Sequence, residues 1–452
     1  MTWRRAAGFR SNCLEVPTLK SRGEQHVTDP RSPGSDSGGS IGDLNLAFVL
    51  VGAAEAAILP FIPLYLFERG FDAPLIGVVV AAAALASFVA GPVWANFADN
   101  RLGSERTVAV ASAVAAVVAL LFALATTKVA VATASIALFA ARAPLIALLD
   151  AIALQRLGAG GRAGYARIRL RMSAGWAVSV VVLGGLFQVG GLKLMPLVYA
   201  PMVLILGLWM WHRQSGTVVI SGAERAPGSV RAPRLNSIPM ALIGFLISAL
   251  LLSAAFAATS NFVTIRINVL GGGALLIGAA AAFQALTEIP TMAYTHVLMR
   301  YLSARVLYVV GIGIYVLVFV AWAFLSDALT TALLKLVMGV GFALTYVAAV
   351  LIADDVAPSH LRATVQALVK SVTGGLAPVL GALGGGVIYG VIGPEAMFLI
   401  AGVVAAGAAV IALIAVPSRR RLQDRVKVEA LIKPAAAGAG DGTTDAYSNR
   451  IE

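Results

Sequence analysis

The feature that most constrains the fold of this chain is a succession of apolar segments, each long enough to cross a lipid bilayer. A helix of about 20 residues spans the roughly 30 Å of hydrocarbon in a membrane. Twelve such segments follow one another, six on each side of a polar stretch. They lie near residues 44–66, 74–97, 107–126, 130–154, 173–191, 194–212, 239–265, 274–298, 306–325, 328–352, 364–391 and 396–416. The pattern predicts an all-α membrane protein with twelve transmembrane helices.

Composition agrees with lipid as the main solvent. Hydrophobic residues make up 59% of the sequence and charged residues 12%, against roughly a quarter charged in a soluble domain. Cys13 is the only cysteine, so no disulfide or cysteine-based metal cluster can form within the chain. There is no phosphate-binding Gly-Lys-Ser/Thr loop, and the four His residues have no metal-binding spacing. We therefore expect no enzyme activity, no cofactor and no metal site.

The net charge of +12 would suggest nucleic-acid binding in a soluble protein. Here most basic residues fall in loops on one side of the predicted membrane, as the positive-inside rule describes for cytoplasmic loops. These are Arg101, Arg106, Arg156, Arg162, Arg167, Arg169, Arg171, Arg213, Arg225, Arg231, Arg234, Arg300, Arg305 and Arg362. The other side has Arg69, Lys128, Lys193 and Arg266. We predict an inner-membrane protein with both termini cytoplasmic and no nucleic-acid partner.

Polar segments divide the chain. Residues 1–40 are rich in Arg, Ser, Pro and Gly, which predicts a disordered cytoplasmic leader unless translation begins further along the chain. A similar composition over 214–237 predicts a cytoplasmic linker. The linker separates six-helix bundles over 41–213 and 238–417, and residues 418–452 are predicted to form a cytoplasmic tail.

A short basic pattern occurs at equivalent places in the two halves. The segment from Arg101 to Arg106 (Arg-Leu-Gly-Ser-Glu-Arg) follows the second span. The segment from Arg300 to Arg305 (Arg-Tyr-Leu-Ser-Ala-Arg) follows the eighth, 199 residues later. This recurrence supports an internal duplication, an architecture that many secondary transporters use.

The segment after the second span resembles a motif of the major facilitator superfamily, Gly-x3-Asp-Arg-x-Gly-Arg-Arg. It contains Asp99, Arg101, Gly103 and Arg106, but Ala95 stands at the first Gly and one residue is inserted after the Asp. The resemblance implies two pseudo-symmetric six-helix bundles around a central cavity that opens alternately to each side. A carboxylate facing Arg side chains here can hold the bundles in one conformation. Asp99, Arg101 and Arg106 are thus predicted to form a latch; a solvated turn is the alternative.

A second segment is similar to lactose permease and phenylpropionate permease relatives. It runs Tyr-Ala-Arg-Ile-Arg-Leu-Arg-Met-Ser-Ala-Gly-Trp from Tyr165 to Trp176. Pro144 in the fourth span and Glu288-Ile-Pro in the eighth look like the phenylpropionate branch. In the lactose permease pattern the second Arg of the segment and the Trp hold the sugar. The resemblance therefore implies Arg169 and Trp176 as solute-binding residues, and Asp150 in the fourth span as a carboxylate partner.

Some positions depart from the sugar symporter pattern. Met172 stands where the relatives have Gly. In the tenth span Lys335 matches the lysine of the pattern, but Met338 and Gly341 occupy the positions of its proton-handling His and Glu. These departures argue against a lactose-like proton mechanism.

Ionisable residues inside the spans are candidates for function, because charges at bilayer depth are costly and usually face a cavity or a partner. Glu55 lies near the middle of the first span, and Arg142, which is also a candidate solute-binding residue, is similarly central in the fourth. Pairing would neutralise their charges. Protonation of Glu55 in a closed state could couple a proton to solute movement, but a purely structural pair is an equal alternative.

The second half offers another set. Glu288 is central in the eighth span, with Gln284 one turn earlier, and is the best proton-carrier candidate of this half. A neutral, hydrogen-bonded carboxylic acid between helices is the alternative. Lys335 and Lys370 lie one to two turns from opposite membrane faces, where snorkelling to the interface is the simpler interpretation. If they point inward, a positive wall would favour an anionic solute, with Gln284 and Lys335 among its binding residues.

Together these patterns predict a secondary active transporter for a small organic solute such as a sugar or aromatic acid. We expect a monomer among membrane lipids, with proton coupling by symport through Glu55, Asp150 or Glu288. Proton-driven efflux of a drug or metabolite, and a non-transporting membrane sensor, are the alternatives. The sequence leaves open the solute, the direction of transport, the coupling ion and the oligomeric state.

Overall fold

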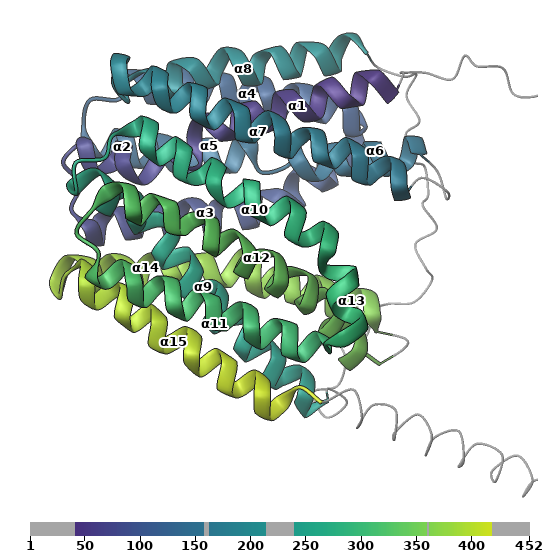
Figure 1. Ribbon diagram of the computed structural model, residues 1–452. Helices are drawn as coiled ribbons and strands as arrows, with labels where there is room; N and C mark the ends of the chain where they lie inside the picture. The colour runs from purple at the N-terminus through teal and green to yellow at the C-terminus, as the bar shows by residue number, and fades with distance from the viewer. Residues whose placement is uncertain (1–40, 158–161, 214–238, 359–360, 418–452) are drawn as a thin grey trace, which may run out of the picture. The chain divides into compact units, whose positions relative to one another are not determined.

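The computed structural model describes residues 41–157, 162–213, 239–358 and 361–417, and these are helical throughout apart from short connections (Figure 1). The first six spans are α1 (Ile41–Ile58) with α2 (Ile62–Glu68), α3 (Ala73–Phe97) with the π-helical η1 (Ala98–Leu102), α4 (Ser104–Leu124), α5 (Lys128–Arg142) with α6 (Leu145–Leu157), α7 (Arg162–Gly190) and α8 (Leu194–His212). The next six are α9 (Met240–Val269), α10 (Ala274–Tyr301), α11 (Ala304–Phe324), α12 (Ala328–Val356), α13 (Arg362–Ser371) with η3 (Val372–Leu376) and α14 (Ala377–Val391), and α15 (Pro394–Ala415).

Twelve helices or helix pairs in these described ranges are long and apolar enough to cross a membrane. They coincide with the twelve segments marked on the sequence, so the all-α membrane fold class is confirmed. The predicted leader, linker and tail lie outside the described residues. The domain boundaries drawn around them therefore stay predictions.

The two sets of six spans repeat the same helix pairings. In the first set, α1 packs against α7 and α8, α4 against α5 and α8, and α3 against α5. The second set has the matching pairs: α9 packs against α14 and α15, α11 against α12 and α15, and α10 against α12 (Figure 1). Each set is thus a bundle with the same internal arrangement, as an inexact internal duplication would produce.

Glycines bring the two sets together through α3 with α14 and α7 with α10. A Cβ atom added to Gly386 of α14 would lie 2.9 Å from the Cα atom of Gly77 on α3. In the other pair, a Cβ atom on Gly184 of α7 would lie 2.7 Å from the carbonyl oxygen of Ala274, the first residue of α10. Such small residues allow backbones to touch where no hydrophobic force drives helices together.

A proline interrupts the fourth span and shapes its surroundings. α5 ends at Arg142, and α6 begins at Leu145 directly after Pro144. Since proline has no backbone N–H, it cannot donate to the carbonyl of Ala140 four residues earlier. The indole Nε1 of Trp94 on α3 donates to that oxygen instead, at 3.1 Å.

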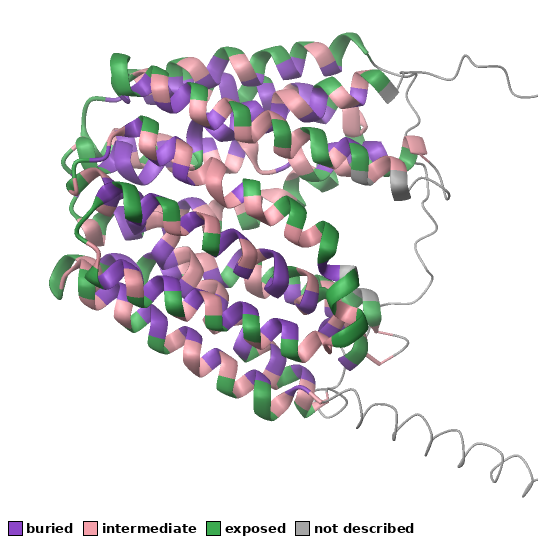
Figure 2. Cartoon of the chain, viewed as in Figure 1, coloured by how far each residue is buried: buried purple, intermediate pink, exposed green. Residues whose placement is uncertain are grey.

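Large apolar residues are exposed along many helices. Exposed positions of every residue type are green in Figure 2. Val93 on α3, Leu121 on α4, Val189 on α7 and Ile414 on α15 are more than half exposed. A soluble monomer does not leave so much apolar surface in water, so these faces are suited to lipid. Inside the bundles, in contrast, a few ionisable side chains are buried.

Candidate functional site

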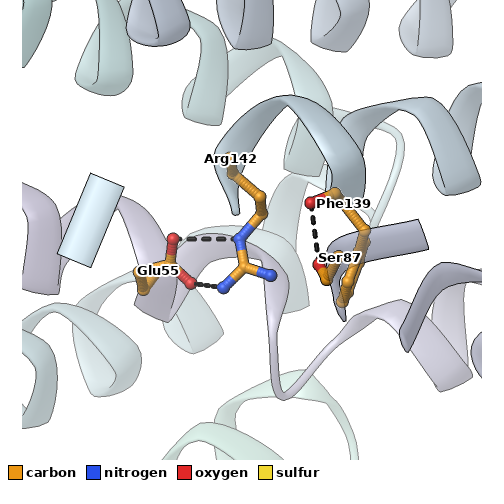
Figure 3. A network of polar contacts seen from close by, with 4 residues as sticks. All are labelled: Glu55, Ser87, Phe139 and Arg142. Atoms are coloured by element: carbon orange, nitrogen blue, oxygen red, sulfur yellow. Dashed lines mark hydrogen bonds and ion pairs between the residues drawn. The ribbon is translucent and has the colours of Figure 1, made fainter. Parts of the chain in front are cut away.

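A buried ion pair joins the first and fourth spans. Arg142, at the end of α5, donates through Nε to Oε1 of Glu55 on α1 at 2.9 Å, and its second nitrogen bonds the other carboxylate oxygen (Figure 3). Glu55 is 1% exposed. The guanidinium also stacks on the ring of Phe139, 4.8 Å from its centroid. Two hydrogen bonds in fork geometry hold the two charges in a fixed relation.

Around this pair, α3 supports the end of α5. The hydroxyl of Ser87 donates to the carbonyl oxygen of Phe139 at 2.8 Å (Figure 3), beside the Trp94 contact to Ala140 described above. These bonds satisfy carbonyl groups at a helix end, where partners inside the helix are missing. They fix the turn of α5 from which Arg142 projects.

A second pair lies between α6 and α7 and is more open. Nη1 of Arg169 is 3.2 Å from Asp150 Oδ1, with the two side chains 40% and 27% exposed. The same nitrogen contacts the sulfur of Met172 at 3.2 Å. Trp176 follows one turn later and is half-buried. The structure thus brings together Asp150 and Arg169, with Trp176 on the same helix.

Close packing of α7 on α1 accompanies this arrangement. A Cβ atom on Gly52 of α1 would strike the carbonyl oxygen of Met172. One turn away, a Cβ atom on Gly175 would lie 2.8 Å from the carbonyl oxygen of Val49. Glycine on α1 opposite Met172, rather than at Met172 itself, therefore provides the space for this contact.

In the second bundle, Lys335 on α12 is only 8% exposed. Its Nζ donates to Oε1 of Gln284 on α10 at 3.2 Å and lies 5.6 Å from the ring centroid of Trp322 on α11. The ammonium therefore does not snorkel to solvent, which corrects the simpler interpretation of the sequence. Lys370, in contrast, is exposed.

Glu288 lies one turn beyond Gln284 on α10 and is half-buried. Its carboxylate makes no hydrogen bond or ion pair with any residue in the described parts of the chain. The side chain of Gln284 is engaged by Lys335 instead. Glu288 and Glu55 are thus both deep carboxylates, but only Glu55 has a fixed cation.

The model of the MFS_1 like family matches residues 43–400. The chain belongs to the major facilitator superfamily. This transporter is 24% identical over 341 residues to the maltose permease of Geobacillus stearothermophilus, covering 73% of the chain and 83% of the permease.

Solved structures show the same fold. The transporter is similar to the nucleoside transporter NupG with a TM-score of 0.72 and 17% identity, covering 84% of this chain and 99% of NupG. It is also similar to a peptide transporter POT in complex with alafosfalin, with a TM-score of 0.67 and 14% identity, covering 84% and 94% of the two chains. Its homologues are transporters rather than enzymes. The phenylpropionate branch is not tested by these comparisons and stays a prediction.

The predicted latch looks different in the structure of the transporter. Asp99 and Arg101, in η1, are exposed and form no hydrogen bond or ion pair with the described residues. Arg106 at the start of α4 has a partner. The clear contact at this place is an ion pair between Glu105 on α4 and Arg156 on α6, 2.5 Å apart.

Sequence reasoning missed this pair, although Glu105 lies inside the motif that drew attention to its neighbours. The signal available was an acid at the start of the third span and an Arg at the end of the fourth. Those two ends meet whenever consecutive spans alternate in direction. Whether any of these residues latches the bundles stays a prediction.

One pocket, of about 240 Å³, lies at the corresponding place in the second bundle. It is lined by the ends of α10 and α12, the start of α11 and the residues after α15, including Arg305 and Asp355. Nη1 of Arg305 donates to the carbonyl oxygen of Val416 at 3.0 Å. None of the predicted solute-binding residues lines this pocket, so it is separate from the candidate site.

Proposed function

We propose that this transporter moves a small organic solute across the inner membrane by alternating access, coupled to a proton that Glu288 carries. In this proposal both termini lie in the cytoplasm, because the arginine-rich loops belong on that side. The printed names of its relatives refer to maltose, nucleoside and peptide transport. These names supply a range of solutes to screen.

The contacts between the bundles support alternating access. Helix α3 meets α14, and α7 meets α10, largely through glycine and backbone atoms. These contacts lie toward the start of α3 and α10 and the end of α7 and α14, at one end of the helices. Two bundles joined at one end can rock about that contact and open the other end.

Glu288 is assigned as the proton carrier because no cation pairs with it in the described parts of the chain. An ionised carboxylate without a partner inside a membrane protein is costly, so its neutral form is favoured when the surroundings are dry. When water reaches it the proton can leave. A carboxyl group that gains or loses its proton as water reaches it can couple proton movement to solute movement.

Glu55 is less suited to the same task. Protonating it would leave Arg142 buried without a counter-charge, and breaking a buried pair in that way costs about 3–5 kcal/mol. We therefore assign the Glu55–Arg142 pair to holding the first and fourth spans together. Asp150, paired with half-exposed Arg169, is placed with the solute-binding residues in this proposal.

The test uses purified protein in lightly buffered, de-energised vesicles, screened with sugars, nucleosides, peptides and organic acids. A transported solute should change the pH with the wild type and with Glu68→Gln, whose carboxyl lies exposed at the end of α2. Glu288→Gln should give no pH change yet still exchange labelled solute, because Gln imitates the neutral acid. An unchanged proton signal in Glu288→Gln would remove Glu288 from the mechanism. Solute flux without any proton signal in the wild type would refute coupling to protons.

A further inference from the structure

Lys335 differs from the other buried cations of this transporter. Arg142 pairs with Glu55, Arg156 with Glu105 and Arg266 with Glu395. Within the described part of the chain, no carboxylate lies within 4.0 Å of Lys335 Nζ. Its single hydrogen-bond acceptor is the neutral amide oxygen of Gln284, although an ammonium has three N–H donors.

A buried ammonium without an anion is unfavourable, because neither an amide oxygen nor an aromatic face replaces the water it has lost. Buried charges are usually paired with an opposite charge. The residues around Lys335 supply the scaffold of an anion site, with one acceptor that can be exchanged. They do not supply the anion.

We propose that Lys335 binds the carboxylate of an organic acid that this transporter carries. Gln284 is half-buried, so a ligand that takes its place at Lys335 does not have to enter a closed core. An organic carboxylate would provide the charge that the amide lacks, and its hydrogen bonds to the ammonium would be charge-assisted. The ring of Trp322 on α11, with its centroid 5.6 Å from Nζ, lies beside the same ammonium.

The position of Glu288 gives this assignment a mechanistic consequence, which rests on the proposed function. Gln284 and Glu288 lie one turn apart on α10, and α10 contacts α7 of the other bundle. In this proposal Glu288, which makes no ion pair within the described residues, takes up the proton that accompanies the acid, and the two cross the membrane together.

The test measures binding, which needs no transport. Purified transporter in detergent is titrated with aliphatic and aromatic monocarboxylic acids, and with the neutral primary amide of each, while its thermal stability is followed. At least one acid should stabilise the wild type and its amide should not. Lys335→Gln should weaken that binding by about tenfold to 100-fold, the size of one lost charged hydrogen bond. Lys193→Gln, in an exposed loop, should bind as the wild type does.

Two further variants keep the result interpretable if Lys335→Gln is poorly folded. Lys335→Arg keeps the positive charge and should retain acid binding. Gln284→Ala removes the competing acceptor and should bind the acid at least as tightly as the wild type. Amides that stabilise as well as acids, or no stabilisation by either set, would overturn the assignment. So would full acid affinity in a folded Lys335→Gln protein.

The outcomes also separate this inference from the proposed function. Acid binding that depends on Lys335, without proton movement in vesicles, would support the anion site and refute proton coupling. Proton-coupled transport of a neutral solute that is insensitive to Lys335→Gln would support coupling and overturn the anion site.

Discussion

The indole of Trp94 on α3 donates to the carbonyl oxygen of Ala140 on α5, the one backbone acceptor that Pro144 leaves without its helical donor. A side chain of the second span thereby completes the hydrogen bonding of the fourth. This hydrogen bond from Trp94 holds the end of α5 in place, and with it Arg142.

The first prediction concerns the hydrogen bond from Trp94 to the Ala140 carbonyl. Trp94→Phe should lower stability by about 1–3 kcal/mol, because the Ala140 carbonyl would be left without a partner. In a Pro144→Ala background the backbone donor returns, so the same change should cost about 1 kcal/mol less. Thermal unfolding of the four proteins in detergent measures the coupling. Equal costs in both backgrounds would show that the hydrogen bond contributes nothing.

The second prediction concerns the buried pair. Glu55→Leu and Arg142→Met should each destabilise the protein by about 3–5 kcal/mol, because each leaves the other charged group buried without its partner. The double variant Glu55→Leu/Arg142→Met should be more stable than either single one. Thermal aggregation assays can rank the variants, with exposed Glu68→Gln as the control. A double variant less stable than both single ones would contradict a mainly structural role.

The third prediction concerns the contact between bundles. Gly386→Val would place a side chain against the backbone of α3 at Gly77 and Ala73. Solute flux should fall by about tenfold or more because this end can no longer close. A Cβ atom on Gly384 meets nothing within 4 Å, so Gly384→Val is the matched control. Similar flux in both variants would argue against closure at this contact.

The fourth prediction is a pH dependence outside the membrane. Asp327 precedes α12, and bonds from the backbone N–H and hydroxyl of Thr330 hold the pKa of its carboxyl below its ordinary value of 3.8. Because the pKa is lowered in the folded protein, the cap stabilises at neutral pH and loses its effect as the pH falls through the folded pKa, below 3.8.

Asp327→Ala should therefore melt at a lower temperature than the wild type near pH 7, and the difference should shrink in acid. Asp72 offers a control at the start of α3, where its side chain makes no capping hydrogen bond. Asp72→Ala should show a smaller difference near pH 7. A constant difference for Asp327→Ala across pH would contradict the cap as its cause.

The fold was predictable because hydrophobic length sets the membrane spans directly, and the twelve marked segments match the observed helices. Depth along a span also placed Glu55 and Arg142 at the same level, and the structure brings them together. Glu55 and Arg142 can meet only because the first and fourth spans lie on the same side of one bundle. The spacing of residues in the sequence does not predict how the spans are placed in the bundle.

Contacts that depend on how each helix is rotated about its own axis could not be predicted from the sequence. The bond from Trp94 to Ala140 requires knowing which face of α3 turns toward α5. The snorkelling predicted for Lys335 is wrong, because a lysine near a span end can equally snorkel or turn inward. Its contact with Gln284 follows from the packing of α12 on α10, which no local pattern in the sequence encodes.

The glycine contacts between α3 and α14 have a consequence for the speed of the transition between states. Side chains that interlock must change rotamer before two surfaces part, and each such change adds a barrier. Where Gly77 faces Gly386 there are no side chains to disengage. In the proposed alternating-access cycle, the two helix surfaces can therefore separate at this point without any change of side-chain rotamer.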